Sequence, residues 1–138
     1  MTGLVRFGVS LEKKLLSEFD RLLKEKGYSS RSEAIRDLIR EDLVRELWRK
    51  DEEVAAAITL VYDHHQRELL NHLTSIQHDY HENILSTQHL HLDHNNCLEV
   101  IAIKGKARRA AELFERLKSC RGIKHAGFTE STTGGKVL

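Results

Sequence analysis

Proline is absent from this chain of 138 residues, cysteine occurs only twice, and no long apolar run is present. Without proline, the breaks between elements must come from glycine, helix caps and charge. Two cysteines, Cys97 and Cys120, are too few for a disulfide scaffold, so we expect thiols available to a metal. No run approaches the roughly 20 apolar residues of a membrane span, and no signal-peptide layout opens the chain. We therefore expect a cytoplasmic protein that has no membrane partner.

The motifs of common enzyme classes are also missing. Neither His64-His65 nor His81-Glu82 continues into the zinc-protease pattern HExxH, because position 85 is leucine. No glycine-rich phosphate loop and no Gly-x-Ser-x-Gly nucleophile elbow occurs. The sequence therefore predicts a protein that is not an enzyme and has no protein substrate.

What is present is unevenly distributed along the chain. Residues 1–50 hold 12 basic and 9 acidic side chains, and residues 51–138 hold 10 and 12, so the halves carry +3 and −2 within a net charge of +1. All nine histidines follow Asp63, and eight of them lie between His64 and His94. A chain of this length forms one medium domain or two small ones. The uneven distribution predicts two domains, over 1–50 and 51–138, with different functions.

The first fifty residues have a β-α-α pattern. Val5, Phe7 and Val9 alternate with polar or small residues, which predicts a short strand with one apolar face. Ser10 is expected to cap a helix that ends at Gly27, and a capping box of Ser30 and Glu33 opens a second helix that ends near residues 48–51. About 45 residues cannot close a core alone, so this part must dimerise.

Two such strands paired antiparallel form a ribbon that fits the major groove of B-DNA. This arrangement resembles the ribbon-helix-helix repressors from Leu4 to about Arg49. The resemblance implies that outward strand side chains read base edges, and these are Arg6, Gly8 and Ser10. Gly8 departs from the family, which usually has a hydrogen-bonding side chain there, so reading would depend on Arg6 and Ser10. The start of the second helix would bind phosphate through Ser29, Ser30 and the amides near Arg31. A dimerisation module with a protein as its main partner, as in an antitoxin, is the alternative.

The second half shows the order β-α-β-β-α-β. This order is typical of a ferredoxin-like, or ACT-like, domain with an antiparallel sheet and both helices on one face, so the whole chain is of the α+β class. A loose tail is expected from Glu130 to Leu138. The expected elements are 54–62, 65–81, 84–93, 97–104, 107–119 and 123–129.

Metal-ligand chemistry is concentrated around one hairpin. His89 and His91 are two apart in a strand and so point to the same side, while Leu90 and Leu92 are expected to point into the sheet core. The hairpin brings Cys97 beside the two imidazoles, and Glu99 is expected to accept a hydrogen bond that orients a histidine. Three ligands leave one coordination position open.

The fourth ligand is expected from the helix over 65–81. His78 is nine residues from Leu69, so it lies roughly 180° from the apolar stripe and faces away from its own core. A ligand that points outward can complete a site in another subunit, so we predict metal sites at subunit interfaces. Three nitrogens and one sulfur suit zinc as well as nickel, and raw affinity favours copper. The same donors with an open position also describe catalytic zinc, a weaker alternative here because the enzyme motifs are missing.

The stretch from Gln77-His78 to Cys97-Leu98-Glu99 and the RSEAIRD sequence at 31–37 resemble the nickel-responsive repressors over nearly the whole chain. The resemblance implies that His89, His91 and Cys97 of one subunit and His78 of a neighbour bind Ni(II) in a square plane, one ion per subunit. It also implies a homotetramer built as a dimer of dimers. Gln77 and Glu99 are expected to support the ligands by hydrogen bonds.

The same resemblance extends to a second cation and to DNA. It implies that Glu33 and Asp37 hold a low-affinity cation and that Arg67 contacts the DNA backbone. The expected function is a nickel-dependent repressor that binds a palindromic double-stranded operator and controls nickel-uptake genes. The alternative is a DNA-binding repressor that responds to zinc, cobalt or copper, or to a small ligand such as an amino acid.

Overall fold

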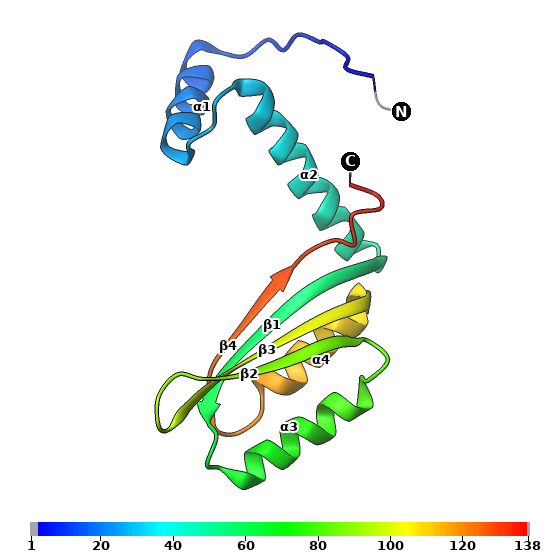
Figure 1. Cartoon of the computed structure of the whole chain (residues 1–138). Coiled ribbons are helices and arrows are strands. Elements are labelled where there is room, and N and C mark those ends of the chain that lie inside the picture. Colours follow the sequence, from blue (N-terminus) through cyan, green and yellow to red (C-terminus); the bar gives the residue numbers. More distant parts are fainter. Residues whose placement is uncertain (1–2, 138) are drawn as a thin grey trace. The chain divides into compact units, whose positions relative to one another are not determined.

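The computed structural model describes residues 3–137 (Figure 1), and these divide into two compact units, one that ends at Ile39 and one that begins at Arg40. The division falls inside helix α2, which runs over Arg31–Arg49. The second half of this helix therefore belongs to the C-terminal unit. No helix among the described residues is both long enough and apolar enough to cross a membrane.

Helix α1 of the N-terminal unit spans Lys13–Lys26 and ends as expected at Gly27, whose φ of 78° is left-handed. The amides of Gly27 and Tyr28 donate to the carbonyls of Lys24 and Leu23, which satisfies the end of the helix. At the other end the prediction of a Ser10 cap is wrong. The N-cap is Glu12, without a side-chain capping bond, so the helix begins two residues later than the apolar stripe indicates.

Residues 3–12 form neither helix nor strand, unlike the strand expected over residues 5–9. Val5, Phe7 and Val9 are 85%, 70% and 60% exposed. A strand is defined by hydrogen bonds to a neighbour, and the described part of one chain offers this segment no second strand. A segment without strand structure in one chain is what we expect if the ribbon forms only between two chains.

Helix α2 starts with half of the expected capping box. The Glu33 amide donates to Ser30 Oγ at 3.2 Å, but the Glu33 carboxylate accepts from the hydroxyl and amide of Ser29 and not from Ser30. The two serines thus share the capping of one helix. The Glu33 pKa is lowered because Ser29 donates these bonds.

The C-terminal unit has a four-stranded antiparallel sheet in the order β2-β3-β1-β4. Two helices connect the strands in the order β-α-β-β-α-β, which confirms the α+β class and the ferredoxin-like topology. Each element lies where the sequence predicted it, with shifts of one or two residues at most ends. The elements are β1 Glu53–Asp63, α3 Arg67–Asp79, β2 Ile84–His91, β3 Asn96–Lys106, α4 Ala107–Lys118 and β4 Ile123–Glu130.

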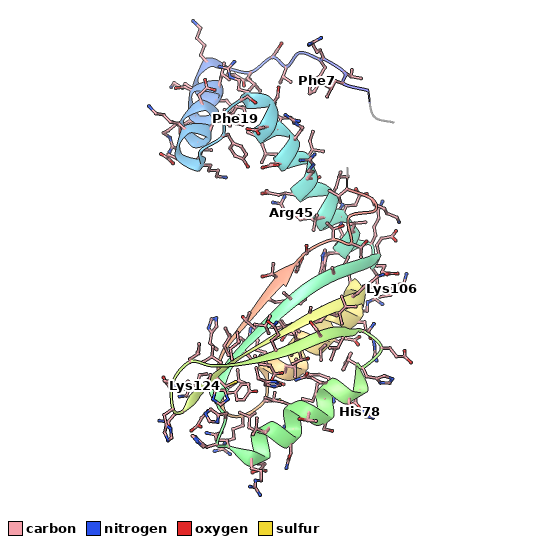
Figure 2. All side chains as sticks on the ribbon, in the orientation of Figure 1. Phe7, Phe19, Arg45, His78, Lys106 and Lys124 are labelled. Atoms are coloured by element: carbon pink, nitrogen blue, oxygen red, sulfur yellow. The ribbon has the colours of Figure 1, made fainter. Side chains whose placement is uncertain are left out.

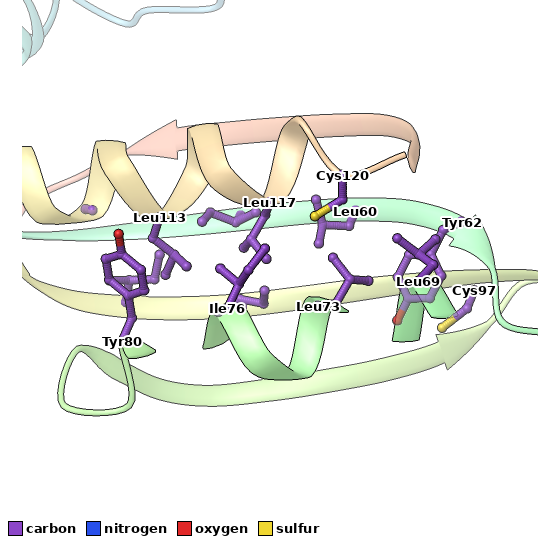
Figure 3. Packing of buried hydrophobic residues seen from close by; sticks show 14 residues of the cluster. Leu60, Tyr62, Leu69, Leu73, Ile76, Tyr80, Cys97, Leu113, Leu117 and Cys120 are labelled. Atoms are coloured by element: carbon purple, nitrogen blue, oxygen red, sulfur yellow. The ribbon is translucent and has the colours of Figure 1, made fainter. Parts of the chain in front are cut away.

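One face of this sheet packs against both helices (Figure 3). Side chains of β1 and β3 alternate between buried and partly exposed, as the period of a strand requires. Leu69, Leu73 and Ile76 of α3 join Leu113 and Leu117 of α4 in the same buried cluster. The two helices therefore cover a single face, and the opposite face remains open in one chain.

The prediction that Leu90 and Leu92 point into the core is wrong. Leu90 is opposite Leu98 in the β2–β3 register, on the open face, and is 47% exposed, while Leu92 is 55% exposed. The buried face is instead the one to which Cys97 and Glu99 belong. Because alternation decides only that neighbours point to opposite sides, the pattern alone did not identify the face that the helices cover.

The tail beyond Glu130 is anchored, which corrects the expectation of a loose end. Ser131 donates its amide to the Ala55 carbonyl and accepts the indole N–H of Trp48 at 2.9 Å. Val137 packs against the cluster of Leu47, Val54 and Ala107. The tail thus joins the end of α2 to the sheet.

Candidate metal centre

The β2–β3 hairpin aligns the expected metal ligands on one side of the sheet. His91 is opposite Cys97 in the register, and His89 is opposite Glu99. Cys97 and Glu99 are 2% and 1% exposed, whereas both histidines are exposed. The hairpin therefore presents two imidazoles at the surface above a thiol and a carboxylate in the core.

Glu99 is a buried carboxylate with three hydrogen-bonding neighbours. Its Oε1 accepts from the Tyr62 hydroxyl at 2.5 Å and lies 2.8 Å from His89 Nε2, and its Oε2 accepts from Gln77 Nε2 at 2.5 Å. A buried carboxylate is tolerated when its oxygens are satisfied in this way. Since a carboxylate only accepts, we assign the hydrogen of the His89 ring to Nε2, which leaves Nδ1 as the ring's acceptor atom.

Tyr62 is the residue of this network that sequence reasoning missed. It is fully buried on β1, directly opposite Cys97 in the register, and Figure 3 shows the two at the same end of the core. Burial, and then the bond to Glu99, raise the Tyr62 pKa well above its ordinary value, so the phenol remains a donor. The alternation of β1 could have indicated that Tyr62 faces the core, but not that it lies beside the thiol.

His78 projects from α3 at the surface, away from the buried stripe of the helix (Figure 2). Its ring stacks on that of His81 with a centroid distance of 5.6 Å. Within residues 3–137, no three side chains of His, Cys, Asp or Glu form a group that could hold an ion. The described chain thus contains the donor types that suit nickel, imidazole and thiolate, without a complete coordination set.

Other histidines gather beside the hairpin. The His64 ring lies 4.2 Å from that of His65 and 4.6 Å from that of His91, and the rings of His65 and His94 are 5.4 Å apart. Asp63 Oδ1 accepts from the His65 amide at 2.9 Å. His91 therefore belongs to a row of imidazoles that the sequence pattern did not single out.

The residues expected at DNA lie in the exposed parts of the chain. Ser29 and Ser30 are engaged with Glu33, and Arg31 makes a two-pronged ion pair with Asp20 of α1 at 2.9 and 3.0 Å. Arg67 is exposed in the first turn of α3, in the other unit. The base-reading candidates are exposed in the segment without regular structure, and these are Arg6, Gly8 and Ser10.

The two carboxylates of the expected cation site already have partners. Glu33 accepts from Ser29, and Asp37 accepts from the Tyr28 hydroxyl at 2.8 Å. Both lie on the N-terminal part of α2. Hydroxyl groups of the preceding turn thus hold them in place.

Comparison with known proteins identifies both halves of the chain. Residues 5–46 match the family model described as ribbon-helix-helix protein, copG family, and residues 55–130 match that of the NikR C-terminal nickel-binding domain. A solved structure of an uncharacterized protein from Thermotoga maritima covers 57% of this chain and 98% of its own, with a TM-score of 0.52 at 15% identity. That likeness concerns the fold alone.

Relatives over the full length agree with the two family models. A nickel-responsive regulator of Syntrophus aciditrophicus is 53% identical over 97% of this chain and 98% of its own. A regulator of the same description from Chlorobium limicola is 54% identical over 97% of this chain and 100% of its own, and one from Thermococcus onnurineus is 48% identical over 98% and 99%. These relatives are regulators and not enzymes. The chain therefore belongs to the family of nickel-responsive regulators, which join a ribbon-helix-helix DNA-binding domain to a nickel-binding domain.

Proposed function

We propose that this chain is a nickel-dependent transcriptional repressor whose metal site is shared between subunits. His89, His91 and Cys97 of one subunit and His78 of another would bind Ni(II), one ion per subunit. The observation that carries this proposal is the exposed His78, which points away from its own core while the other three donors lie together on the hairpin. A site divided in this way is complete only in an assembly.

Hydrogen bonds of the chain orient the ligands of this site. Because Glu99 occupies Nε2 of His89, the other ring nitrogen, Nδ1, is the one available to the metal. Tyr62 and Gln77 hold the carboxylate in turn. Bound nickel would supply a cross-link between α3 of one subunit and the hairpin of the next, which favours one arrangement of the assembly.

The assembly that we propose is a homotetramer, a dimer of dimers. Two apolar surfaces on separate units support it. One is the N-terminal segment with Val5, Phe7 and Val9, and the other is the open face of the sheet with Leu90. Each surface is suited to a second copy of the chain.

The partner that we propose for the N-terminal units is a palindromic double-stranded operator, which places the protein in the cytoplasm with the DNA. Two N-terminal segments paired as a ribbon would present Arg6 and Ser10 to base edges, while Gly8 lets the ribbon approach closely. The serines at the start of α2 and the α3 residue Arg67 would contact phosphate. Arg31 is held by Asp20, so we assign the phosphate contact at this point to backbone amides and not to its guanidinium.

We propose two further features on the same basis. The regulated genes would be those of nickel uptake, since a repressor that binds nickel senses its supply. Glu33 and Asp37 would hold a low-affinity cation while the protein is docked on DNA, because their carboxylates share one face of α2. A response to zinc, cobalt or copper remains the alternative, since the same donors bind each of them.

Mixed assemblies of two full-length variants test the shared site. His78→Ala keeps the three hairpin ligands, and Cys97→Ala keeps His78. Neither variant alone should develop the nickel–thiolate absorption band, whereas coexpressed chains should recover part of it. If the coexpressed chains also lack the band, the division of the site between subunits is contradicted. A full band in His78→Ala alone would contradict it as well.

A further inference from the structure

The turn that follows His78 is fastened to α4 by two arginines. Arg116 Nη1 lies 3.2 Å from Asp79 Oδ2, and Arg109 Nη2 donates to the Asp79 carbonyl at 3.0 Å. We propose that Arg109 and Arg116 are positioning residues that place His78 for the metal site of another subunit, an inference that rests on the proposed shared site. We name the two arginines and the Asp79–Tyr80 pair the α4 clamp.

The clamp also encloses an aromatic ring. Tyr80 is 5% exposed, and the guanidinium carbons of Arg109 and Arg116 lie 4.2 and 5.5 Å from its ring centre. Arg109 and Arg116 are seven residues apart, so they project from the same side of α4, two turns from each other. Cations over an aromatic face attract it, and they do so more strongly as water is removed. The two arginines thus hold both Asp79 and Tyr80.

The clamp is tied to the sheet as well as to the helix. Arg109 Nε donates to Asn83 Oδ1 at 3.2 Å, and Asn83 exchanges hydrogen bonds with the backbone of Lys104 in β3. A Cβ on Gly105 would lie 2.3 Å from the Asn83 amide nitrogen, so glycine leaves room for this side chain. The turn after His78 therefore has a fixed support in two elements.

Support on both flanks distinguishes His78 from an ordinary surface histidine. On the N-terminal side, Gln77 is bonded to the buried Glu99, and on the C-terminal side Asp79 and Tyr80 lie in the clamp. The His78 carbonyl accepts from the amide and the ring of His81. His78 itself remains exposed. A backbone fixed on each side and an exposed ring are what a ligand needs when its metal belongs to a different chain, because little backbone freedom is then lost on binding.

The test divides the site between two coexpressed full-length chains. The acceptor carries His78→Ala and supplies the three hairpin ligands, and the donor carries Cys97→Ala and supplies His78. Arg109→Gln and Arg116→Gln are placed together in the donor or, as the matched arm, together in the acceptor. Arg108→Gln in the donor is the control, because its amide bond to Asp51 is kept. Nickel affinity is measured by competition with a chelator, with the nickel–thiolate band as the readout.

We expect the double substitution to weaken nickel binding about 10-fold to 100-fold in the donor and to leave it unchanged in the acceptor. When Arg116→Lys replaces Arg116→Gln in the donor, much of the nickel affinity should return, because the lysine keeps a cation beside Asp79. An equal loss in both arms would show a general structural role and overturn the proposal, as would no loss in the donor arm. If the unsubstituted pair forms no nickel site, the proposed function itself is wrong.

A measurement on the metal-free protein completes the test. The amides of Tyr80 and His81 close the turn by donating to the carbonyls of Gln77 and His78. We expect their hydrogen exchange to be faster in the Arg109→Gln, Arg116→Gln double variant than in the Arg108→Gln control. Unchanged exchange would mean that the clamp does not hold the turn, which contradicts the proposal.

Discussion

At the scale of single residues, the central feature is the buried carboxylate of Glu99, which would orient His89 in the proposed metal site. Glu99 has two residue donors besides His89, and it lies on the same strand as Cys97, two residues away. The sequence was sufficient to predict that Glu99 and Cys97 share a face, because strand alternation determines it. It was insufficient for Tyr62, because the pairing of β1 with β3 is a long-range contact.

Removal of the Tyr62 hydroxyl tests this network. We expect Tyr62→Phe to weaken nickel binding about 10-fold to 100-fold, because Glu99 loses a donor and His89 is less firmly oriented. The loss of a buried bond to a charged acceptor should also lower the free energy of unfolding by about 2 kcal/mol. Tyr28→Phe is the matched control, since it removes a tyrosine bond to a carboxylate in the other unit. Equal nickel affinities of the two variants would count against the network.

The ion pair of Asp20 and Arg31 gives a prediction for pH. The hydrogen bond from Arg31 lowers the Asp20 pKa. The stability that this pair contributes is therefore fully present above the unfolded-state pKa of about 3.9 and is lost as the pH falls through the lower folded-state value. We expect Asp20→Asn to reduce stability at pH 7 and to make no difference in strong acid. Urea denaturation at a series of pH values measures this difference in stability. A difference that grows as the pH falls would contradict the prediction.

At the scale of elements, the amphipathic patterns predicted the helices and strands of the C-terminal unit, because each element there packs side chains in or against one core of its own chain. Periodicity was insufficient for two predictions. The strand over residues 5–9 would form only with a strand of another chain, and the direction of Leu90 depends on which face of the sheet the helices cover. The anchored tail was missed because its single polar contact with Trp48 bridges 83 residues of sequence.

Trp48 is the element-scale test of that anchor. Its indole donates to the Ser131 carbonyl, and its ring meets Phe128 edge to face at 5.4 Å. We expect Trp48→Phe to keep an aromatic ring there and lose the hydrogen bond, at a cost of about 1 kcal/mol in the free energy of unfolding. Limited proteolysis should then cut the tail faster. A tail as resistant as in the wild type would contradict the anchoring role.

At the scale of the whole molecule, one chain contains two incomplete parts. The N-terminal unit exposes an apolar segment that we expect a second chain to cover, and the proposed metal site on the hairpin would take its fourth ligand from another subunit. In the described chain the apolar segment and the hairpin belong to different units, so two different contacts between subunits would cover the one and complete the other. This separation is what a dimer of dimers provides.

Phe7→Ser tests the separation of the two contacts. Phe7 is 70% exposed in one chain, and we expect it to be buried when two N-terminal segments pair. The polar variant should sediment as a smaller assembly and lose specific DNA binding, while its nickel affinity stays close to that of the wild type. Sedimentation velocity combined with a nickel titration measures both properties. Loss of nickel binding along with the assembly would contradict two independent contacts.

The most direct test of the central claim is the dependence of DNA binding on nickel. A duplex selected from a random library by the nickel-loaded protein serves as the operator, and fluorescence anisotropy at one fixed salt concentration measures its affinity. We predict that stoichiometric nickel tightens operator binding by the wild type and has no effect on Cys97→Ala. Operator binding by the wild type that is equally tight without nickel, or an unchanged nickel response in Cys97→Ala, would contradict the account.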